Sequence, residues 1–159
     1  MPARTDLPLL LIDIASRSNA SGKITGRTRL MKLAFLAQME TPGAVAELVG
    51  TAEPYHFSKY LYGPFSSELL SDLDSLSLQN FIVQRSIPLD QEGKVIRWEY
   101  SLTDRGAERV RNFIGTRPVQ ELGALVAKYQ GSSTRELLRY VYTKYLRGDE
   151  STLVEGPVP

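Results

Sequence analysis

The run from Tyr60 to Leu76 constrains the fold of this chain more than any other segment, because signals for a strand, a tight turn and a helix follow one another within it. Its first residues, 60–62, favour an extended conformation, and the Gly63-Pro64 pair then breaks it. Ser66 is a typical helix N-cap, and leucines at helical spacing predict an amphipathic helix from Ser66 or Ser67 to about Leu78. This succession of elements is typical of the centre of a winged-helix domain.

Apolar residues at helical spacing predict two helices before this run, over about residues 6–18 and 27–40. One further short helical turn is expected at 44–49. A strand is predicted over 55–61, because aromatic and aliphatic residues alternate there, and it leads directly into the central helix.

Two β-rich runs follow the central helix, at 81–86 and 95–102, and they predict a hairpin with a long tip. We expect the strand before the central helix to pair with this hairpin. Three more helices are predicted, over about 103–114, 118–129 and 134–146, from their capping residues and periodicity.

The predicted fold class is α+β and mostly α: a winged helix-turn-helix with a small antiparallel sheet and two extra C-terminal helices. Residues 1–146 should form one domain, in which 118–146 is a helical extension that closes the core of its own chain or contributes to a homodimer. Residues 147–159 are rich in Pro, Gly and acids, so we expect a disordered tail. The long link before the central helix also fits a general α+β domain with no groove-reading role.

Composition argues against several classes of function. The 159 residues include no cysteine, which excludes disulfides, thiol nucleophiles and cysteine-ligated zinc and suits a reducing cytoplasm. His56 is the only histidine, and no phosphate-binding loop, dinucleotide fingerprint or Gly-x-Ser-x-Gly motif is present. No stretch approaches the roughly twenty apolar residues of a membrane span. We therefore expect a cytoplasmic protein that acts by binding, with no catalytic residue, cofactor or metal.

With a formal net charge of +1, attraction to nucleic acid must come from a local patch. On the second predicted helix, Arg29 and Lys32 lie close together while Leu30 and Leu33 turn inward, so a basic edge could contact phosphates. The predicted hairpin adds cations where a wing usually contacts DNA. The candidate nucleic-acid-binding residues are Lys23, Arg27, Arg29, Lys32, Arg85, Lys94 and Arg97. The plainer interpretation of the same charges is a solvated helix face.

The central helix has a different chemistry, because it contains no Lys or Arg and its outward residues are serines and acids. Such a face opposes a polyanion but suits a protein partner that presents basic groups. Tyrosines on the preceding strand would extend this surface if they are exposed. The candidate partner-binding residues are Tyr60, Tyr62, Ser67, Glu68, Ser71 and Asp74.

Three segments give the chain a resemblance to a known group: Gly26–Leu36, Tyr60–Leu69 with its Tyr-Gly-Pro-Phe-Ser element, and Tyr100–Gly106. The pattern is similar to that of the YwgA-like proteins, which in turn resemble the SocA-like or Panacea antitoxin domains. The resemblance covers about residues 24–110. It implies a fold and a broad association with prokaryotic regulation or toxin neutralisation, and it supplies no catalytic residue.

Two hypotheses about function follow. The first is a DNA-associated regulator of transcription that binds double-stranded DNA through the basic residues. The second is a protein-interaction module or antitoxin that neutralises a protein partner, such as a toxin, through the acidic central helix and the Tyr-Gly-Pro surface.

Overall fold

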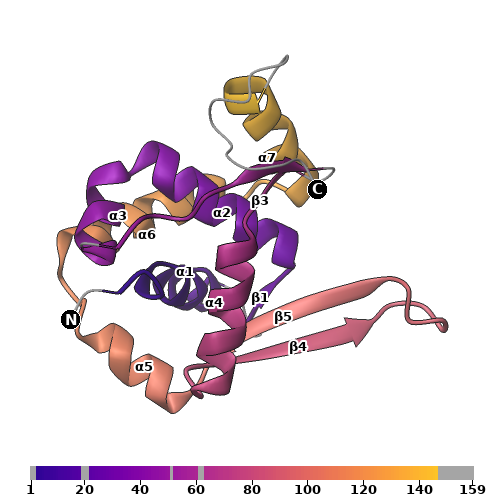
Figure 1. Cartoon of the computed structure of the whole chain (residues 1–159), viewed down its shortest axis with the longest axis horizontal. Helices are drawn as coiled ribbons and strands as arrows, with labels where there is room; N and C mark the ends of the chain where they lie inside the picture. The colour runs from indigo at the N-terminus through magenta and orange to yellow at the C-terminus, as the bar shows by residue number, and fades with distance from the viewer. Residues whose placement is uncertain (1–2, 19–21, 51, 61–62, 147–159) are drawn as a thin grey trace.

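The computed structural model describes residues 3–18, 22–50, 52–60 and 63–146 of the chain (Figure 1). The described part is α+β and mostly helical, as the sequence predicts, and it ends in a short π-helical turn at Tyr142–Leu146. The other elements, in chain order, are α1 (Asp6–Arg17), β1 (Ile24–Thr25), α2 (Arg27–Glu40), α3 (Pro42–Val49), β2 (Ser58–Tyr60), β3 (Gly63–Phe65), α4 (Ser67–Leu78), β4 (Ile82–Pro88), β5 (Ile96–Leu102), α5 (Asp104–Arg111), α6 (Arg117–Tyr129) and α7 (Thr134–Val141).

Helix α1 is the centre of the core, with other elements on several sides of it (Figure 1). It packs against α2, α3, α5, α6 and β5. Six consecutive apolar side chains can be buried at once only in a helix that is covered nearly all round. These side chains are Leu7, Pro8, Leu9, Leu10, Leu11 and Ile12.

The main sheet has three antiparallel strands in the order β1-β5-β4. Strands β4 and β5 pair from Ile82 opposite Leu102 to Pro88 opposite Ile96. Strand β1 adds to the other edge of β5, with Ile24 opposite Tyr100. Because β1 immediately precedes α2, this pairing fixes the beginning of α2 beside the hairpin.

The pairing of the strand before α4 differs from the sequence prediction. Strand β2 pairs with β3 in a separate two-stranded sheet, with Tyr60 opposite Gly63, and not with the β4–β5 hairpin. Gly63 adopts a φ of 100°, a backbone conformation that would be strained in any residue with a side chain. Glycine at this position therefore allows the chain to reverse direction within a few residues. The strand that pairs with the β4–β5 hairpin is instead β1.

Helix α4 forms where the sequence predicts it. The Ser66 side chain accepts a hydrogen bond from the backbone N–H of Leu69, as an N-cap should. Leu69, Leu73 and Leu76 are buried against the body of the protein. The opposite side of the helix is exposed.

The β4–β5 hairpin extends away from the helical body as a separate arm (Figure 1). Its base is covered, since Ile82 and Tyr100 are buried, but most residues from Arg85 to Arg97 are exposed. The hairpin is therefore anchored by its inner third, and both faces of its outer part meet solvent.

The C-terminal helices close the core of their own chain. Helix α6 packs on α1 and α3, and α7 packs on α2. Of the two roles expected for residues 118–146, closure of the chain's own core agrees with the burial of their main apolar side chains, and a contribution to a homodimer stays a prediction. These side chains are Leu122, Leu125, Val126, Tyr129, Leu137 and Val141.

The predicted disordered tail, 147–159, lies outside the described residues. Among the residues that are described, the structure contains no helix of the length and apolar character needed to cross a membrane.

Candidate functional site

One side of α4 presents a small, polar surface without a basic group. Ser67, Ser71 and Asp74 are exposed, and Leu78 at the end of the helix is 88% exposed. These four residues, which we call the α4 face, recur at spacings of three and four and so share one side of the helix. Three of them are partner-binding candidates from the sequence, and the structure brings those three together.

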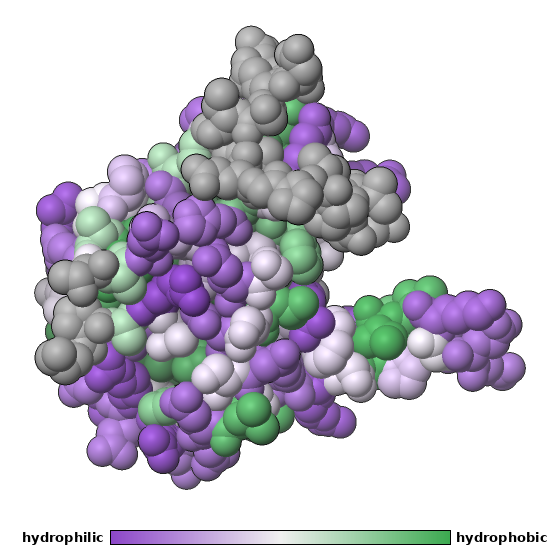
Figure 2. All heavy atoms as spheres, in the orientation of Figure 1, coloured by the Kyte–Doolittle hydropathy of each residue, from purple (hydrophilic) through white to green (hydrophobic). Residues whose placement is uncertain are grey.

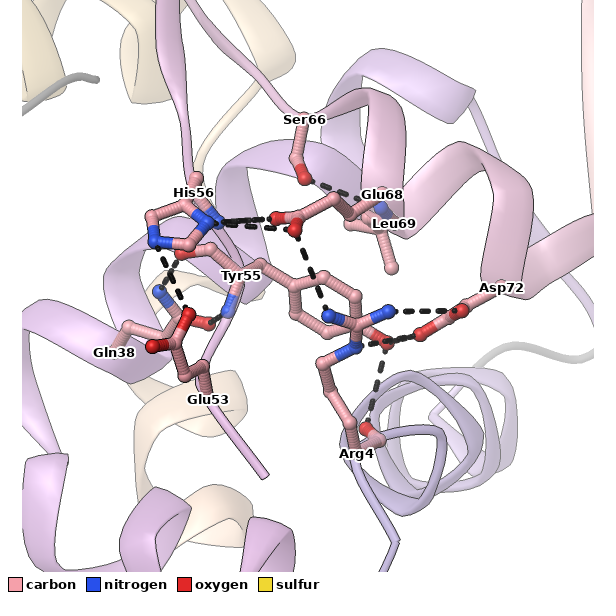
Figure 3. A network of polar contacts seen from close by, with 9 residues as sticks. All are labelled: Arg4, Gln38, Glu53, Tyr55, His56, Ser66, Glu68, Leu69 and Asp72. Atoms are coloured by element: carbon pink, nitrogen blue, oxygen red, sulfur yellow. Dashed lines mark hydrogen bonds and ion pairs between the residues drawn. The ribbon is translucent and has the colours of Figure 1, made fainter. Parts of the chain in front are cut away.

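The side of α4 next to the N-terminal segment is held by an ion pair. Both oxygens of the Asp72 carboxylate accept hydrogen bonds from the Arg4 guanidinium, at 2.9 and 3.2 Å, and the Tyr55 hydroxyl donates to the same group at 2.6 Å (Figure 3). Burial raises the pKa of the Tyr55 hydroxyl, and its hydrogen bond to Asp72 raises it further, so Tyr55 stays a neutral donor. Arg4 and Tyr55 thereby fix α4 against the body.

Glu68 is occupied within the chain, although the sequence predicts it to face a partner. Its carboxylate accepts a hydrogen bond from the backbone N–H of His56 at 2.8 Å and lies 3.2 Å from Nδ1 of the same residue, and Arg4 approaches it to 3.7 Å. Burial opposes its ionisation, but the contacts with His56 and Arg4 outweigh this and lower the pKa of Glu68. Figure 3 shows the side chain directed at these residues. Glu68 lies four residues from Asp72 and so shares the side of α4 that Arg4 covers.

Gln38 positions the segment that reaches α4. Its amide oxygen accepts from the Tyr55 N–H at 2.7 Å, and its amide nitrogen donates to the Tyr55 carbonyl at 2.9 Å (Figure 3). This two-point bond from α2 takes the place of a strand partner. It holds His56 and Tyr55 in register with α4.

Asp74 connects α4 to the hairpin. Its carboxylate accepts from the Gln84 side-chain nitrogen at 2.7 Å, and the Gln84 side-chain amide oxygen accepts in turn from Arg27 at 3.4 Å. The Arg27 guanidinium also donates to the Tyr100 hydroxyl at 2.7 Å and lies 3.6 Å from the centre of the Trp98 ring. Arg27, predicted to contact phosphates, is thus the residue that joins α2 to the hairpin and, through Gln84, to the α4 face.

Lys32 does not belong to an exposed basic edge, and this part of the prediction is wrong. Its side chain is fully buried, beneath the turn at Gly63, where a Cβ would lie 3.6 Å from the Lys32 Nζ. Burial lowers its pKa to about 8. The periodicity of α2 indicated one buried side, but the β2–β3 unit covers a second side of that helix.

Arg29 is likewise directed into the protein. Its guanidinium donates to the backbone carbonyls of Ser132 at 2.8 Å and Tyr129 at 3.0 Å. These carbonyls lie at the end of α6 and in the turn that follows. Arg29 and Lys32 therefore do not form the shared surface edge that the helical wheel predicts.

The cations of the hairpin region lie at the surface, and most of them are paired with acids. Lys23 and Arg97 both contact Glu99, at 3.5 and 3.4 Å, and Lys94 contacts Glu92 at 2.9 Å. Arg85 is exposed on β4. The predicted wing is thus basic only in part.

The hairpin also carries an apolar surface that the sequence analysis missed. Figure 2 shows hydrophobic atoms gathered on the projecting arm. Four large side chains there are each more than two-fifths exposed: Val83, Leu89, Val95 and Ile96. The available signal was the apolar character of the hairpin tip, which extends too far from the helices to be covered by them.

Two predicted partner residues cannot be placed. Tyr62 and the side chain of Tyr60 lie outside the described residues. The candidate surface therefore rests on the α4 face and on the hairpin. In the described part of the chain, no group of three or more His, Cys, Asp or Glu side chains could hold a metal ion.

A scan against protein-family models finds no match to this chain, and a search of curated proteins finds no similar sequence.

Proposed function

We propose that this chain is a winged-helix-type module that acts by binding a protein, without catalysis, through the α4 face and the adjacent hairpin. The element order supports the winged-helix assignment: α1, β1, α2 and α4 precede a hairpin, and β1 lies beside β5 in one sheet. In this view α3 and the β2–β3 unit are insertions between the first two helices of the motif and the helix that would contact a partner.

The α4 face is the observation that favours a protein over DNA. A helix that enters a major groove needs side chains that tolerate or bind phosphates, whereas the exposed residues here are two serines, one aspartate and one leucine. When a partner covers Leu78 and the exposed apolar residues of the hairpin, their apolar surface is removed from water, which favours binding. A toxin-type partner, which the resemblance to antitoxin domains implies, is one protein of this kind.

DNA association is the second candidate, and Arg85 is the observation that favours it. This residue is exposed on the projecting hairpin, and Arg97 on the neighbouring strand is 46% exposed. A wing of this kind could contact phosphates without any contribution from α4.

The decisive experiment compares the two partners directly. The chain is titrated against random duplex DNA at low salt, and in parallel a photo-crosslinking residue is placed at Ser71 in cells that express the protein. We expect no salt-dependent DNA binding and one discrete crosslinked protein. The crosslink should be lost in Leu78→Glu and kept in Ile114→Glu, because Ile114 is similarly exposed but lies after α5.

Micromolar DNA affinity that falls steeply with salt would instead support the second candidate. In that case Arg85→Glu should weaken binding to all sequences alike. A Ser71 crosslink that Leu78→Glu leaves unchanged would contradict the proposed surface.

A further inference from the structure

A cavity of about 320 Å³ lies apart from the α4 face, where the end of α1, β1, the first turn of α2, the end of α6 and the start of α7 meet. Its volume is within the range of small-molecule sites. Polar groups line one part of it, and Leu33 and Val126, both buried, line another. The polar lining includes Thr25, Arg29, Gln130, Ser132, Ser133 and Thr134.

Arg29 is the charged group of this cavity, and its surroundings differ from those of Arg4 and Arg109, which are also partly buried. Arg4 and Arg109 each meet a carboxylate in a two-point ion pair, which raises the pKa of both guanidinium groups. Arg29 meets only two backbone carbonyls, and no described carboxylate lies within ion-pair distance of it. Burial alone lowers its pKa. A desolvated cation without a counter-charge is costly unless an anion compensates it.

The Arg29 guanidinium has hydrogen-bond donors left to serve such an anion. It carries five N–H groups, and two of them are used by the carbonyls of Tyr129 and Ser132. The unused groups are one N–H each on Nε, Nη1 and Nη2. No fully buried side-chain nitrogen or oxygen in the described residues lacks a partner, so Nε, which has none, is open to solvent or to the cavity that Arg29 lines. The two carbonyl bonds fix the orientation of the guanidinium before a ligand arrives.

Hydroxyl groups complete the set of donors. Ser132, Ser133 and Thr134 are consecutive residues of the turn before α7. The Ser133 side chain already accepts from Glu136 N–H, and the Glu136 carboxylate accepts from Ser133 N–H at 2.7 Å. The carboxylate of Glu136 therefore repels an anion at the Ser133 end of the turn. An anionic group is better placed beside Arg29, Ser132 and Thr134.

We propose that this cavity binds a small anionic molecule, whose phosphate or carboxylate group pairs with Arg29 and the hydroxyls of Ser132 and Thr134 while its apolar part contacts Leu33 and Val126. The planar fork of a guanidinium suits both kinds of anion. This inference does not depend on the protein partner proposed above.

The test is an NMR titration of the full chain with inorganic phosphate and, separately, with butyrate, at constant ionic strength. We expect saturable shifts of the backbone amides of residues 130–134 with at least one of the two probes. The probe that gives the tighter curve identifies the class of anion. Shifts that stay linear with both probes, or that spread over the whole surface, would overturn the proposal.

Matched variants assign the site. Arg29→Gln should weaken binding at least about tenfold, an amount typical of one charge-assisted pair. Arg135→Gln removes the same charge from the exposed side of the α7 start and should leave the affinity within about twofold. An equal loss in both variants would show diffuse attraction and contradict a built site.

Arg29→Gln could also disturb the carbonyls that Arg29 holds. Thr134→Val removes a lining hydroxyl and leaves those bonds intact, so it tests the same cavity in a folded protein. Unchanged affinity in Thr134→Val together with Ser132→Ala would remove the turn from the site and overturn the proposal as stated.

Discussion

A Cβ atom placed on Gly106 would lie 2.1 Å from the backbone carbonyl oxygen of Phe81. Gly106 is in the first turn of α5, and its N–H donates to the Thr103 side chain at 3.1 Å, while Thr103 N–H donates to that same Phe81 carbonyl. The start of α5 therefore packs directly on the backbone that enters β4, and only glycine permits the contact.

Gly106→Ala should destabilise the protein by about 3 kcal/mol, the upper part of the range for forced overpacking, because neither backbone can move away cheaply. Urea unfolding measures the change. The control is Gly123→Ala in α6, where a Cβ would meet nothing within 4 Å. That variant should be neutral or up to about 1 kcal/mol more stable through helix propensity, and a Gly106 variant as stable as the control would refute the clash.

Arg109 neutralises a carboxylate inside the protein. Asp6 is only 2% exposed and accepts from the Arg109 guanidinium at 2.9 and 2.7 Å, which joins α1 to α5. Arg109→Met should cost about 3–5 kcal/mol, since it leaves the Asp6 charge buried without its partner. Thermal unfolding checks this, with Arg111→Met as the exposed control. If both variants unfold at the same temperature, the ion pair contributes nothing.

Glu40 should make stability depend on acid pH. Burial opposes ionisation of its carboxyl, but hydrogen bonds from the hydroxyls of Tyr129, Tyr140 and Tyr145, at 2.6, 2.7 and 2.7 Å, outweigh this and lower its pKa to about 2. Because the folded pKa is below the ordinary value of 4.5, the stabilisation is complete above about pH 4.5 and is lost as the pH falls through about 2.

Glu40→Gln should therefore lower the free energy of unfolding at pH 7 by on the order of 2 kcal/mol, and the gap to the unmodified chain should close as the pH approaches 2. Denaturant titrations across this window test the prediction. Glu108→Gln, an exposed acid on α5, should show no such convergence. A gap that is independent of pH would assign the effect to packing instead of charge.

Arg27 should govern the rigidity of the hairpin. Trp98 is the only tryptophan, so its fluorescence reports on the guanidinium 3.6 Å above its ring. Arg27→Ala should shift the Trp98 emission and speed amide exchange in β4 and β5 by an amount equivalent to about 1–2 kcal/mol, while α1 keeps its protection. Arg85→Ala, on the exposed part of the same arm, serves as the control, and equal effects in both variants would contradict the anchoring role.

Local patterns were enough to predict most elements. Helix α2 spans Arg27–Glu40 as predicted, and Ser66 caps α4 as its type and position indicate. The hairpin lies within two residues of its expected ends. Helical periodicity, capping and turn residues act over a few positions, so they can be read along the chain without knowledge of what packs where.

The candidate site was predicted only in part, because these local patterns do not show which distant segments contact a side chain. Ser67, Ser71 and Asp74 share an exposed side of α4 because that side depends on local periodicity alone. Lys32 and Arg29 depended on elements more than thirty and about one hundred residues away, the Gly63 turn and the end of α6, which cover and bind them. The residues near Lys32 and Arg29 in the sequence do not indicate that these distant segments pack on them.

The sequence by itself determined where most helices and the hairpin form and that Ser67, Ser71 and Asp74 of α4 meet solvent. Only the tertiary structure decided that β2 pairs with β3, that Arg27 stacks on Trp98 and that Arg29 reaches the turn before α7. The physical reason is range: backbone conformation is set by near neighbours, whereas strand partners and buried charges are selected by the free energy of the whole packed chain.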